Sequence, residues 1–229
     1  MKIVLKFGGT SLASPKDIRN VAKTITSFSK GNQIVVVCSA VDGVTDDLIT
    51  ISRLIEQRRK NNIVANLNGV IIKHRKLANQ TIKNSVIKKQ LLEKLNTDVS
   101  ELQELVRGLT LLKEVSARSL DYLISFGERL SDDLVSYALQ DLKKKSTALN
   151  GKEVGIVTDS NFGESRPLMD TTRIRISKTL GSLLSKKVIP VVGGFAGADQ
   201  HGNITTFGRG GSDYTATIIA SCINADEVW

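Results

Sequence analysis

The chain of 229 residues contains few of the side chains from which metal sites and nucleophilic sites are usually built. Its two cysteines, Cys38 and Cys222, show neither a paired metal-ligand spacing nor a C-x-x-C motif. We therefore predict that both are small buried side chains in a cytoplasmic protein. With only His74 and His201 present, a Ser-His-Asp hydrolase or a histidine-rich metal site is a poor candidate. We expect no protein side chain to act as a metal ligand.

Long apolar segments are missing as well. No apolar run approaches the roughly 18 residues needed to span a bilayer. The opening residues Met1–Lys6 lack the length and the cleavage site of a signal peptide. An apolar fraction of 41% and a charged fraction of 24% are ordinary for a soluble globular protein. These features argue against a disordered or fibrous chain and against a membrane partner.

Aromatic residues are scarce, and this bears on how the positive charge of the chain is interpreted. The net charge is +9, and residues 53–114 contribute +7 of it. A basic stretch can bind nucleic acid or a membrane surface. However, no Phe, Tyr or Trp that could stack on a base occurs between residues 29 and 121. We interpret the basic stretch, which includes Lys73, as a solvated helical face with no nucleic-acid partner; a non-catalytic basic binding module is the alternative.

Strand and helix patterns alternate in the first 60 residues. Apolar runs at residues 2–7 and 33–38 predict buried strands, and apolar spacing predicts helices after Pro15 and over about 45–59. This order is typical of a parallel α/β sheet with right-handed crossovers. Residues 62–142 are poor in glycine and contain no proline, which predicts several helices in succession.

The strand pattern returns after residue 145. The sequence predicts strands at 146–150, 154–158 and 187–192, helices near 171–186 and 212–223, a hairpin around 201–203, and a final strand from 226. Because Pro190 has no backbone N–H, we expect it at the beginning of its strand or at an unpaired position.

Eight of the eighteen glycines form three clusters, and each cluster follows a predicted strand. The clusters are Gly8-Gly9, Gly193-Gly194-Gly197 and Gly208-Gly210-Gly211. Glycine at a strand end lets backbone N–H groups approach an anion, and open α/β sheets bind their ligands there. The phosphate signatures of P-loop enzymes, Rossmann dehydrogenases and protein kinases are all absent. The clusters therefore predict a different kind of anion site.

Five segments in order resemble the signature motifs of the aspartate kinases, a branch of the amino acid kinase family. They are KFGGTS at 6–11, SAVDGVTD at 39–46, SFGE at 125–128, VVGGFAG at 191–197 and GRGGSD at 208–213. Gly193 stands where that family usually has Thr. The resemblance implies a three-layer αβα sandwich with a mainly parallel central sheet, built by residues 1–229 as one catalytic domain. It also implies that a nucleotide-binding segment and regulatory ACT domains would follow Trp229, so we expect the chain alone to fold but to lack activity.

The resemblance further implies the reaction. The γ-phosphoryl group of ATP would be transferred to the side-chain carboxylate of aspartate, in the biosynthesis of lysine, threonine and methionine. That carboxylate is ionised at pH 7, so no general base is required, and positioning with charge neutralisation supplies most of the catalysis. ATP and Mg²⁺ would be the cofactors, with Mg²⁺ bound mainly through the ATP phosphates. We also expect a homo-oligomer.

The residue roles implied by the resemblance divide into three groups. Lys6 would neutralise the transferring phosphoryl group, Asp213 would orient Lys6, and a loop of four residues would hold phosphate oxygens: Gly8, Gly9, Thr10 and Ser11. Arg209 has the planar fork that binds a carboxylate through two hydrogen bonds, and would take the α-carboxylate of aspartate. Glu128 would pair with the α-ammonium group. The remaining substrate contacts would come from Ser39, Thr45 and Ser212.

Simpler roles for these residues stay open at this point. Lys6 and Arg209 could be ordinary surface cations, Glu128 could pair with Arg129 within its helix, and Thr45 could serve only as a helix cap. A different member of the family, acting on another small acid, is the second enzyme hypothesis. The joint presence of Arg209 and Glu128 favours a zwitterionic amino acid over such a substrate.

Overall fold

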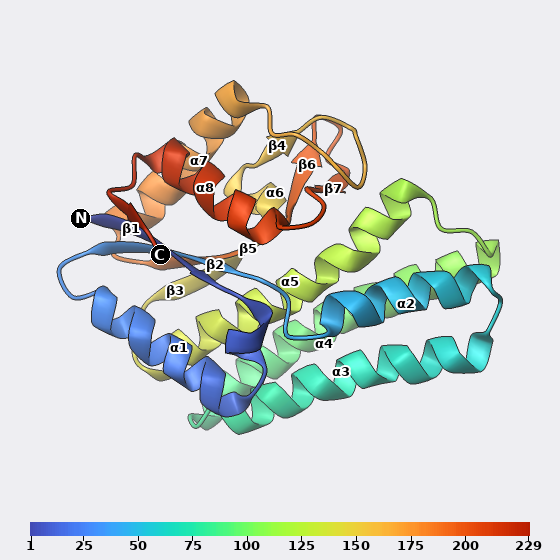
Figure 1. Cartoon of the computed structure of the whole chain (residues 1–229). Helices are drawn as coiled ribbons and strands as arrows, with labels where there is room; N and C mark the ends of the chain where they lie inside the picture. Colours follow the sequence, from blue (N-terminus) through green and yellow to red (C-terminus); the bar gives the residue numbers. More distant parts are fainter.

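The computed structural model describes residues 1–229 and places a five-stranded sheet between two layers of helices (Figure 1). The strand order is β3-β5-β2-β1-β8, and every neighbouring pair is parallel. The strands are β1 (Lys2–Phe7), β2 (Gln33–Cys38), β3 (Ser146–Leu149), β5 (Ile189–Gly193) and β8 (Glu227–Val228). The αβα arrangement expected from the sequence is confirmed.

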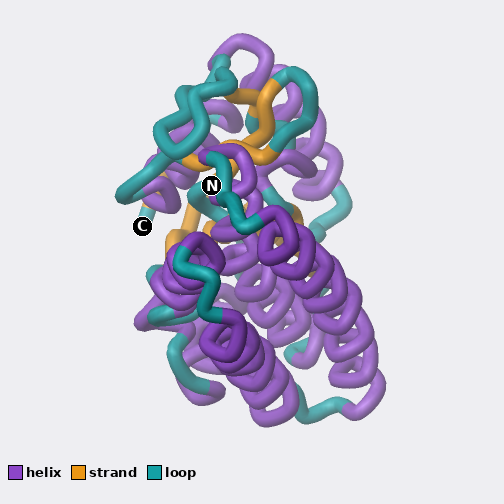
Figure 2. Tube along the Cα trace, turned by 90° about the vertical axis from the view of Figure 1, so that its right-hand side faces the viewer, coloured by secondary structure: helices purple, strands orange, loops and turns teal.

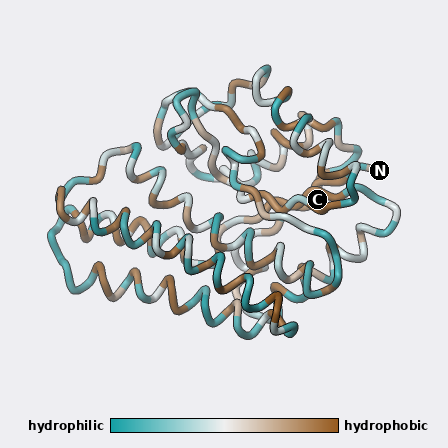
Figure 3. The backbone as a smooth tube through the Cα atoms, turned by 180° about the vertical axis from the view of Figure 1, so that it is seen from behind, coloured by the Kyte–Doolittle hydropathy of each residue, from teal (hydrophilic) through white to brown (hydrophobic).

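Both faces of the sheet are buried, which explains the continuous apolar runs of its strands. Successive side chains of a strand point to opposite faces. On β1, Ile3 and Leu5 therefore join one hydrophobic core, while Val4 joins the other. On β2, Val36 and Val37 are divided between the two cores in the same way. Figure 3 shows these hydrophobic strands in the middle of the molecule.

The larger helical layer contains 39 buried residues in its core. Its helices are α1 (Pro15–Phe28), α2 (Val44–Glu56), α3 (Lys60–Thr81), α4 (Ser85–Leu112) and α5 (Ala117–Asp141). Figures 1 and 2 show that α2 to α5 run side by side and extend as a bundle beyond the sheet. The succession of helices predicted over 62–142 is thus confirmed. None of the helices in the structure is apolar over a length sufficient to cross a bilayer.

The second layer combines helices with a small sheet. Its elements are α6 (Gly151–Val154), α7 (Met169–Ser185), α8 (Gly211–Ile223), and a β4-β6-β7 sheet of Val157–Thr158, Ala196–Asp199 and Ile204–Thr206. The hairpin predicted around 201–203 joins β6 to β7. The strand predicted over 154–158 is wrong in two respects: the observed strand β4 begins only at Val157, and it does not belong to the central sheet. Asn150 and Glu153 form a capping box that begins helix α6, so Val154 is helical. Strand β4 then pairs with β6 outside the central sheet.

Pro190 and the cysteines occupy the environments that the sequence predicts. Pro190 is the second residue of β5, and pairing of β5 with β2 begins only at Val191. The missing N–H therefore costs no hydrogen bond to β2. Cys38 and Cys222 are both buried and unpaired.

Two glycines provide a matched test of this packing. A Cβ atom added to Gly151 would lie 1.8 Å from the carbonyl oxygen of Ala196, whereas one added to Gly181, within α7, meets no atom within 4 Å. We expect Gly151→Ala to lower the free energy of unfolding by about 2 kcal/mol or more, because α6 or β6 must move. Gly181→Ala should raise it by ~1 kcal/mol through helix propensity. Urea titrations of both variants measure the two changes, and a stable Gly151→Ala variant would contradict the contact between α6 and β6.

Candidate active site

The loops at the carboxyl ends of β1 and β2 meet the β7–α8 loop around a cavity of about 360 Å³. Eight of the eleven site residues predicted from the sequence line this cavity: Lys6, Gly9, Ser39, Thr45, Glu128, Arg209, Ser212 and Asp213. The other three adjoin it in the chain. Gly8 lies beside Lys6, and Thr10 and Ser11 belong to the short 3₁₀ helix η1 (Gly9–Leu12). The structure therefore brings together residues as far apart in sequence as Lys6 and Asp213.

Lys6 and Asp213 form an ion pair across the mouth of the cavity. The Lys6 Nζ atom lies 2.7 Å from Asp213 Oδ1, and Asp213 is in the first turn of α8. The Lys6 side chain is 23% exposed, whereas that of Asp213 is 71% exposed. Lys6 is therefore held at the cavity by a carboxylate, as the predicted orienting role of Asp213 requires, and is not a free surface lysine.

Two glycines allow the loops of the cavity to approach closely. A Cβ atom on Gly9 would lie 2.8 Å from the Ala40 carbonyl oxygen, so only glycine lets the β1 loop touch the β2 loop without a shift. A Cβ atom on Gly194 would lie 2.8 Å from Ser212 Cβ, at the start of α8. Glycine at these two positions thus permits the close contact between the segments that surround the cavity.

Glu128 carries a buried carboxylate with one free oxygen. It is only 5% exposed; its Oε1 accepts a hydrogen bond of 3.2 Å from the Ala40 N–H, and its Oε2 has no partner. Burial, which disfavours the charged form, raises the pKa of Glu128 to about 8. Arg129 pairs instead with Asp98 and Glu101 of α4, so the alternative that Glu128 pairs with Arg129 is wrong.

Arg209 is the free cation of the cavity. It lies between Gly208 and Gly210, whose φ angles of 72° and 77° turn the β7–α8 loop, and its guanidinium makes no ion pair or hydrogen bond within the chain. Thr45 is the second residue of α2, and the N-cap position belongs to Gly43, so the capping alternative for Thr45 is wrong. An unpartnered carboxylate oxygen and an unpaired guanidinium therefore line one cavity.

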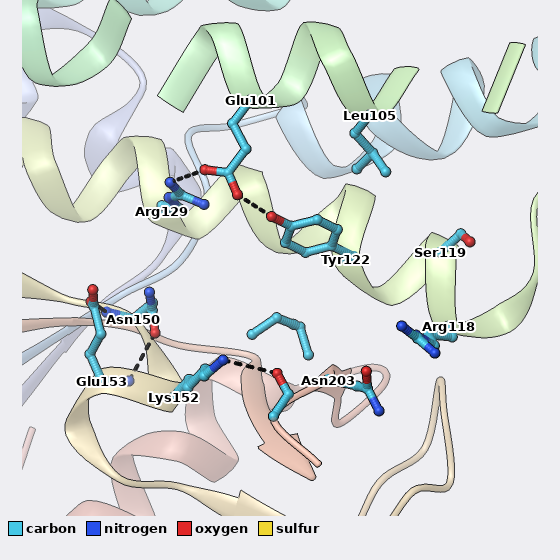
Figure 4. A pocket seen from close by; sticks show the side chains of 12 residues that line it. Glu101, Leu105, Arg118, Ser119, Tyr122, Arg129, Asn150, Lys152, Glu153 and Asn203 are labelled. Atoms are coloured by element: carbon cyan, nitrogen blue, oxygen red, sulfur yellow. Dashed lines mark hydrogen bonds and ion pairs between the residues drawn. The ribbon is translucent and has the colours of Figure 1, made fainter. Parts of the chain in front are cut away.

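A larger cavity of about 750 Å³ lies between α4, α5, α6 and the β6–β7 hairpin, and is lined by none of the eleven predicted residues. Figure 4 shows that most of its charged groups already have partners, with the exception of Arg118. Glu101 binds both Arg129 and the Tyr122 hydroxyl, and Lys152 donates to the Gly202 carbonyl oxygen. Groups already paired in this way offer less to a ligand than Glu128 and Arg209 do. The smaller cavity is therefore the better candidate active site.

Comparison with known proteins identifies the family of the chain. A model of the amino acid kinase family matches residues 1–229, the whole of the sequence. The chain belongs to the amino acid kinase family. No group of three or more His, Cys, Asp or Glu side chains is arranged to hold a metal ion in this amino acid kinase.

Several relatives with curated descriptions are aspartokinases. The chain is 31% identical over 230 residues to chloroplastic aspartokinase 2 of Arabidopsis thaliana, and 30% identical over 227 residues to the aspartokinase of Geobacillus stearothermophilus. Each match covers 98% of this chain but only 40% of the relative. The chain thus spans about two fifths of the length of these relatives.

Solved structures agree in fold. Escherichia coli aspartokinase III in complex with aspartate and ADP superimposes with a TM-score of 0.89 at 25% identity, over 100% of this chain and 48% of that protein. The aspartate kinase of Synechocystis gives a TM-score of 0.58 at 29% identity, over 99% of this chain and 27% of that protein.

Some residues around the cavity of this amino acid kinase are not predicted from the sequence. The backbone N–H of Ala40 holds Glu128, and a backbone group leaves no signal in a sequence. Phe195 lines the cavity with a φ of 69°, which is rare for a bulky side chain. Lys73 is a correction, because it is half-buried and its Nζ donates to the Asp42 carbonyl oxygen at 2.9 Å, where the sequence suggested a solvated cation.

Glu128→Gln tests the burial of the carboxylate. The pKa of Glu128 is about 8 in the folded chain and near 4.5 when exposed, so the protonated form favours folding below pH ~4.5 and this contribution is lost as the pH rises through 8. We expect the Tm of the variant minus the Tm of the wild type to increase by several degrees between pH 5 and pH 9, because only the wild type is destabilised when the carboxyl group ionises. Each pKa unit corresponds to about 1.4 kcal/mol, and 1 kcal/mol moves Tm by ~2–4 °C in a chain of this size.

The exposed Glu104 of α4 provides the control. Differential scanning calorimetry of Glu104→Gln should give a Tm difference from the wild type that changes little over the same pH range. A Glu128→Gln variant that behaves like Glu104→Gln would show that the Glu128 carboxyl is not buried.

Proposed function

We propose that the chain forms the aspartate-binding part of an aspartate kinase, which transfers the γ-phosphoryl group of ATP to the side-chain carboxylate of L-aspartate. One observation carries the proposal: a buried carboxylate with an unpartnered oxygen and an unpaired guanidinium line the same small cavity. An α-amino acid presents an ammonium and a carboxylate on adjacent carbons, so Glu128 and Arg209 are complementary to it. The names of the relatives support the same substrate.

The reaction needs no base. An oxygen of the aspartate side-chain carboxylate forms a bond to the γ-phosphorus, and the bond from that phosphorus to the bridging oxygen breaks. The products are 4-phospho-L-aspartate and ADP, and no proton moves because the attacking carboxylate is already ionised. The difficulty is the repulsion between a carboxylate and a polyphosphate. We assign to Lys6, which pairs with Asp213, the neutralisation of the phosphoryl group during transfer.

The remaining site residues take supporting roles in this proposal. Ser39, Thr45 and Ser212 offer hydroxyl groups at the cavity wall for the substrate carboxylates. The loop of Gly8, Gly9, Thr10 and Ser11 lies next to Lys6, where its backbone would face phosphate oxygens. ATP is the proposed donor, supported by the ADP complex of E. coli aspartokinase III.

Several finer points stay predictions. Mg²⁺ would accompany ATP and bind mainly through its phosphates and water. A place in the formation of lysine, threonine and methionine is predicted from the resemblance alone. A cytoplasmic location, which the cysteines of the sequence suggest, and self-association are predictions as well.

The second hypothesis is an amino acid kinase that acts on a different small acid. A phosphate-type acceptor has no ammonium group, so such an enzyme would not need the buried carboxylate of Glu128. The basic binding module is not favoured, because the match to aspartokinases covers 98% of the chain and therefore includes residues 53–114.

The reaction is tested by trapping the acyl phosphate as a hydroxamate with hydroxylamine. We expect the intact gene product to form aspartyl hydroxamate only with both ATP and aspartate, and Lys6→Met to lower kcat by about 10²–10³-fold, the effect of losing one preorganised charged donor. Lys2→Met, at the other end of β1, should leave kcat within about twofold. If the Lys6→Met enzyme retains more than a third of the wild-type kcat, Lys6 has no role at the phosphoryl group.

Arg209→Lys tests the carboxylate contact. The variant keeps the positive charge but loses the paired N–H donors, so KM for aspartate should rise by ~10-fold or more while KM for ATP changes little. Arg118→Lys is the matched control, because Arg118 is also unpaired but lines the larger cavity. Equal increases in both KM values would instead place Arg209 at the nucleotide or in the support of the fold.

A further inference from the structure

A second carboxylate of α5 is buried at a distance from the candidate active site, and the proposed reaction does not use it. Asp121 is 1% exposed. Its Oδ2 accepts hydrogen bonds of 2.9 Å from the backbone N–H groups of Gly163 and Thr206, and its Oδ1 accepts one of 2.7 Å from the Thr206 hydroxyl. All three donors come from the layer on the other side of the site, so Asp121 joins α5 to β7 and to the loop around Gly163.

Both of its partners lead directly to Arg209. Thr206 is the last residue of β7, and Arg209 follows three residues later. Gly163 abuts the same loop, since a Cβ atom on Gly208 would lie 3.0 Å from the Gly163 carbonyl oxygen. Figure 1 shows β7 beside the first turns of α5, and the two elements are in contact. Asp121 therefore holds the base of the loop that carries Arg209 and the segment against which that loop rests.

Glu128 follows Asp121 by seven residues on the same helix. Residues seven apart lie on the same face of an α-helix, about 10.5 Å apart along its axis. Glu128 binds the β2 loop through the Ala40 N–H, while Asp121 binds the end of β7. One rigid helix thus makes contact with both walls of the cavity.

We propose that Asp121 is a positioning residue that fixes Arg209 relative to Glu128, so that the site recognises the separation of ammonium and carboxylate in one α-amino acid. The inference rests on the proposed function, because it takes Arg209 and Glu128 as the two substrate contacts. Asp121 does not touch the substrate. It acts through the end of β7, and its loss should affect recognition of the α-carboxylate in particular.

The test compares three ligands that differ by one group. Aspartate carries both α-substituents, β-alanine lacks the α-carboxylate, and succinate lacks the ammonium. Their dissociation constants are measured by NMR titration with the intact gene product. We expect Asp121→Ala to raise the dissociation constant of aspartate at least tenfold and to change that of β-alanine by less than twofold. The reason is that only a ligand with an α-carboxylate binds Arg209.

Asp141 provides a matched control on the same helix. It lies at the other end of α5 and accepts hydrogen bonds from the backbone N–H groups of Lys83 and Asn84, far along the chain from the cavity loops. Asp141→Ala should leave the affinity for all three ligands within twofold. If Asp121→Ala fails to fold, Asp121→Asn and Thr206→Val test the same contact with milder changes. Each of these variants should weaken the binding of aspartate more than the binding of β-alanine.

The outcomes separate this inference from the proposed function. If the wild type prefers aspartate to both analogues and the Asp121 variants keep that preference unchanged, Asp121 has no positioning role while the proposed function stands. Equal weakening of aspartate and β-alanine would likewise reduce Asp121 to a support of the fold. If the wild type does not distinguish the three ligands, the proposed function and this inference both fail.

Discussion

The buried carboxylate of Glu128 is the group on which the arrangement of the site depends. A carboxyl group in an apolar interior is costly unless it is hydrogen-bonded or neutralised. Here a single backbone N–H, that of Ala40, satisfies one oxygen, and the other oxygen is left without a partner within the chain. Burial disfavours the ionised form and raises the pKa of Glu128 to about 8, so a cation beside the carboxylate is what would favour ionisation. An ammonium group of a substrate would be such a cation.

Fixing this carboxylate requires that α5 itself be fixed. Arg129, the next residue along the helix, pairs with Asp98 and Glu101 of α4, and Asp98 also binds Lys94. These contacts tie α5 to the helical bundle on the side away from the sheet. On the other side, Asp121 ties it to β7. The helix that carries Glu128 is therefore held from two directions by charged groups, which limits its rotation and the movement of the carboxylate.

Close backbone approach brings the other half of the site into place. Gly9 lets the β1 loop touch the β2 loop, and Gly194 lets the end of β5 touch the start of α8. Lys6 then reaches Asp213 across the gap between β1 and α8. A Cβ atom at either glycine would force these segments to shift apart. The dependence of the site on glycine is thus a matter of distances between loops.

The sequence by itself determined the fold class, the order of most elements and the residue types of the site. Side chains alternate between the two faces of a strand, so a continuous apolar run such as 33–38 indicates a strand that is buried on both faces of the sheet. The sequence contains the Asn150–Glu153 spacing of a capping box, which indicates the start of α6, so the helical residues before β4 could have been predicted. The pairing of β4 with β6, outside the central sheet, could not, because the two strands are distant in sequence.

Nor could the sequence indicate the roles of Ala40 and Asp121. Every residue except proline has a backbone N–H, so the sequence does not indicate that the one of Ala40 binds Glu128. A single aspartate on a helix is usually exposed, and only the packing of β7 against α5 buries Asp121. Only the tertiary structure decided which groups are buried, and burial sets both the pKa of Glu128 and the contacts of Asp121.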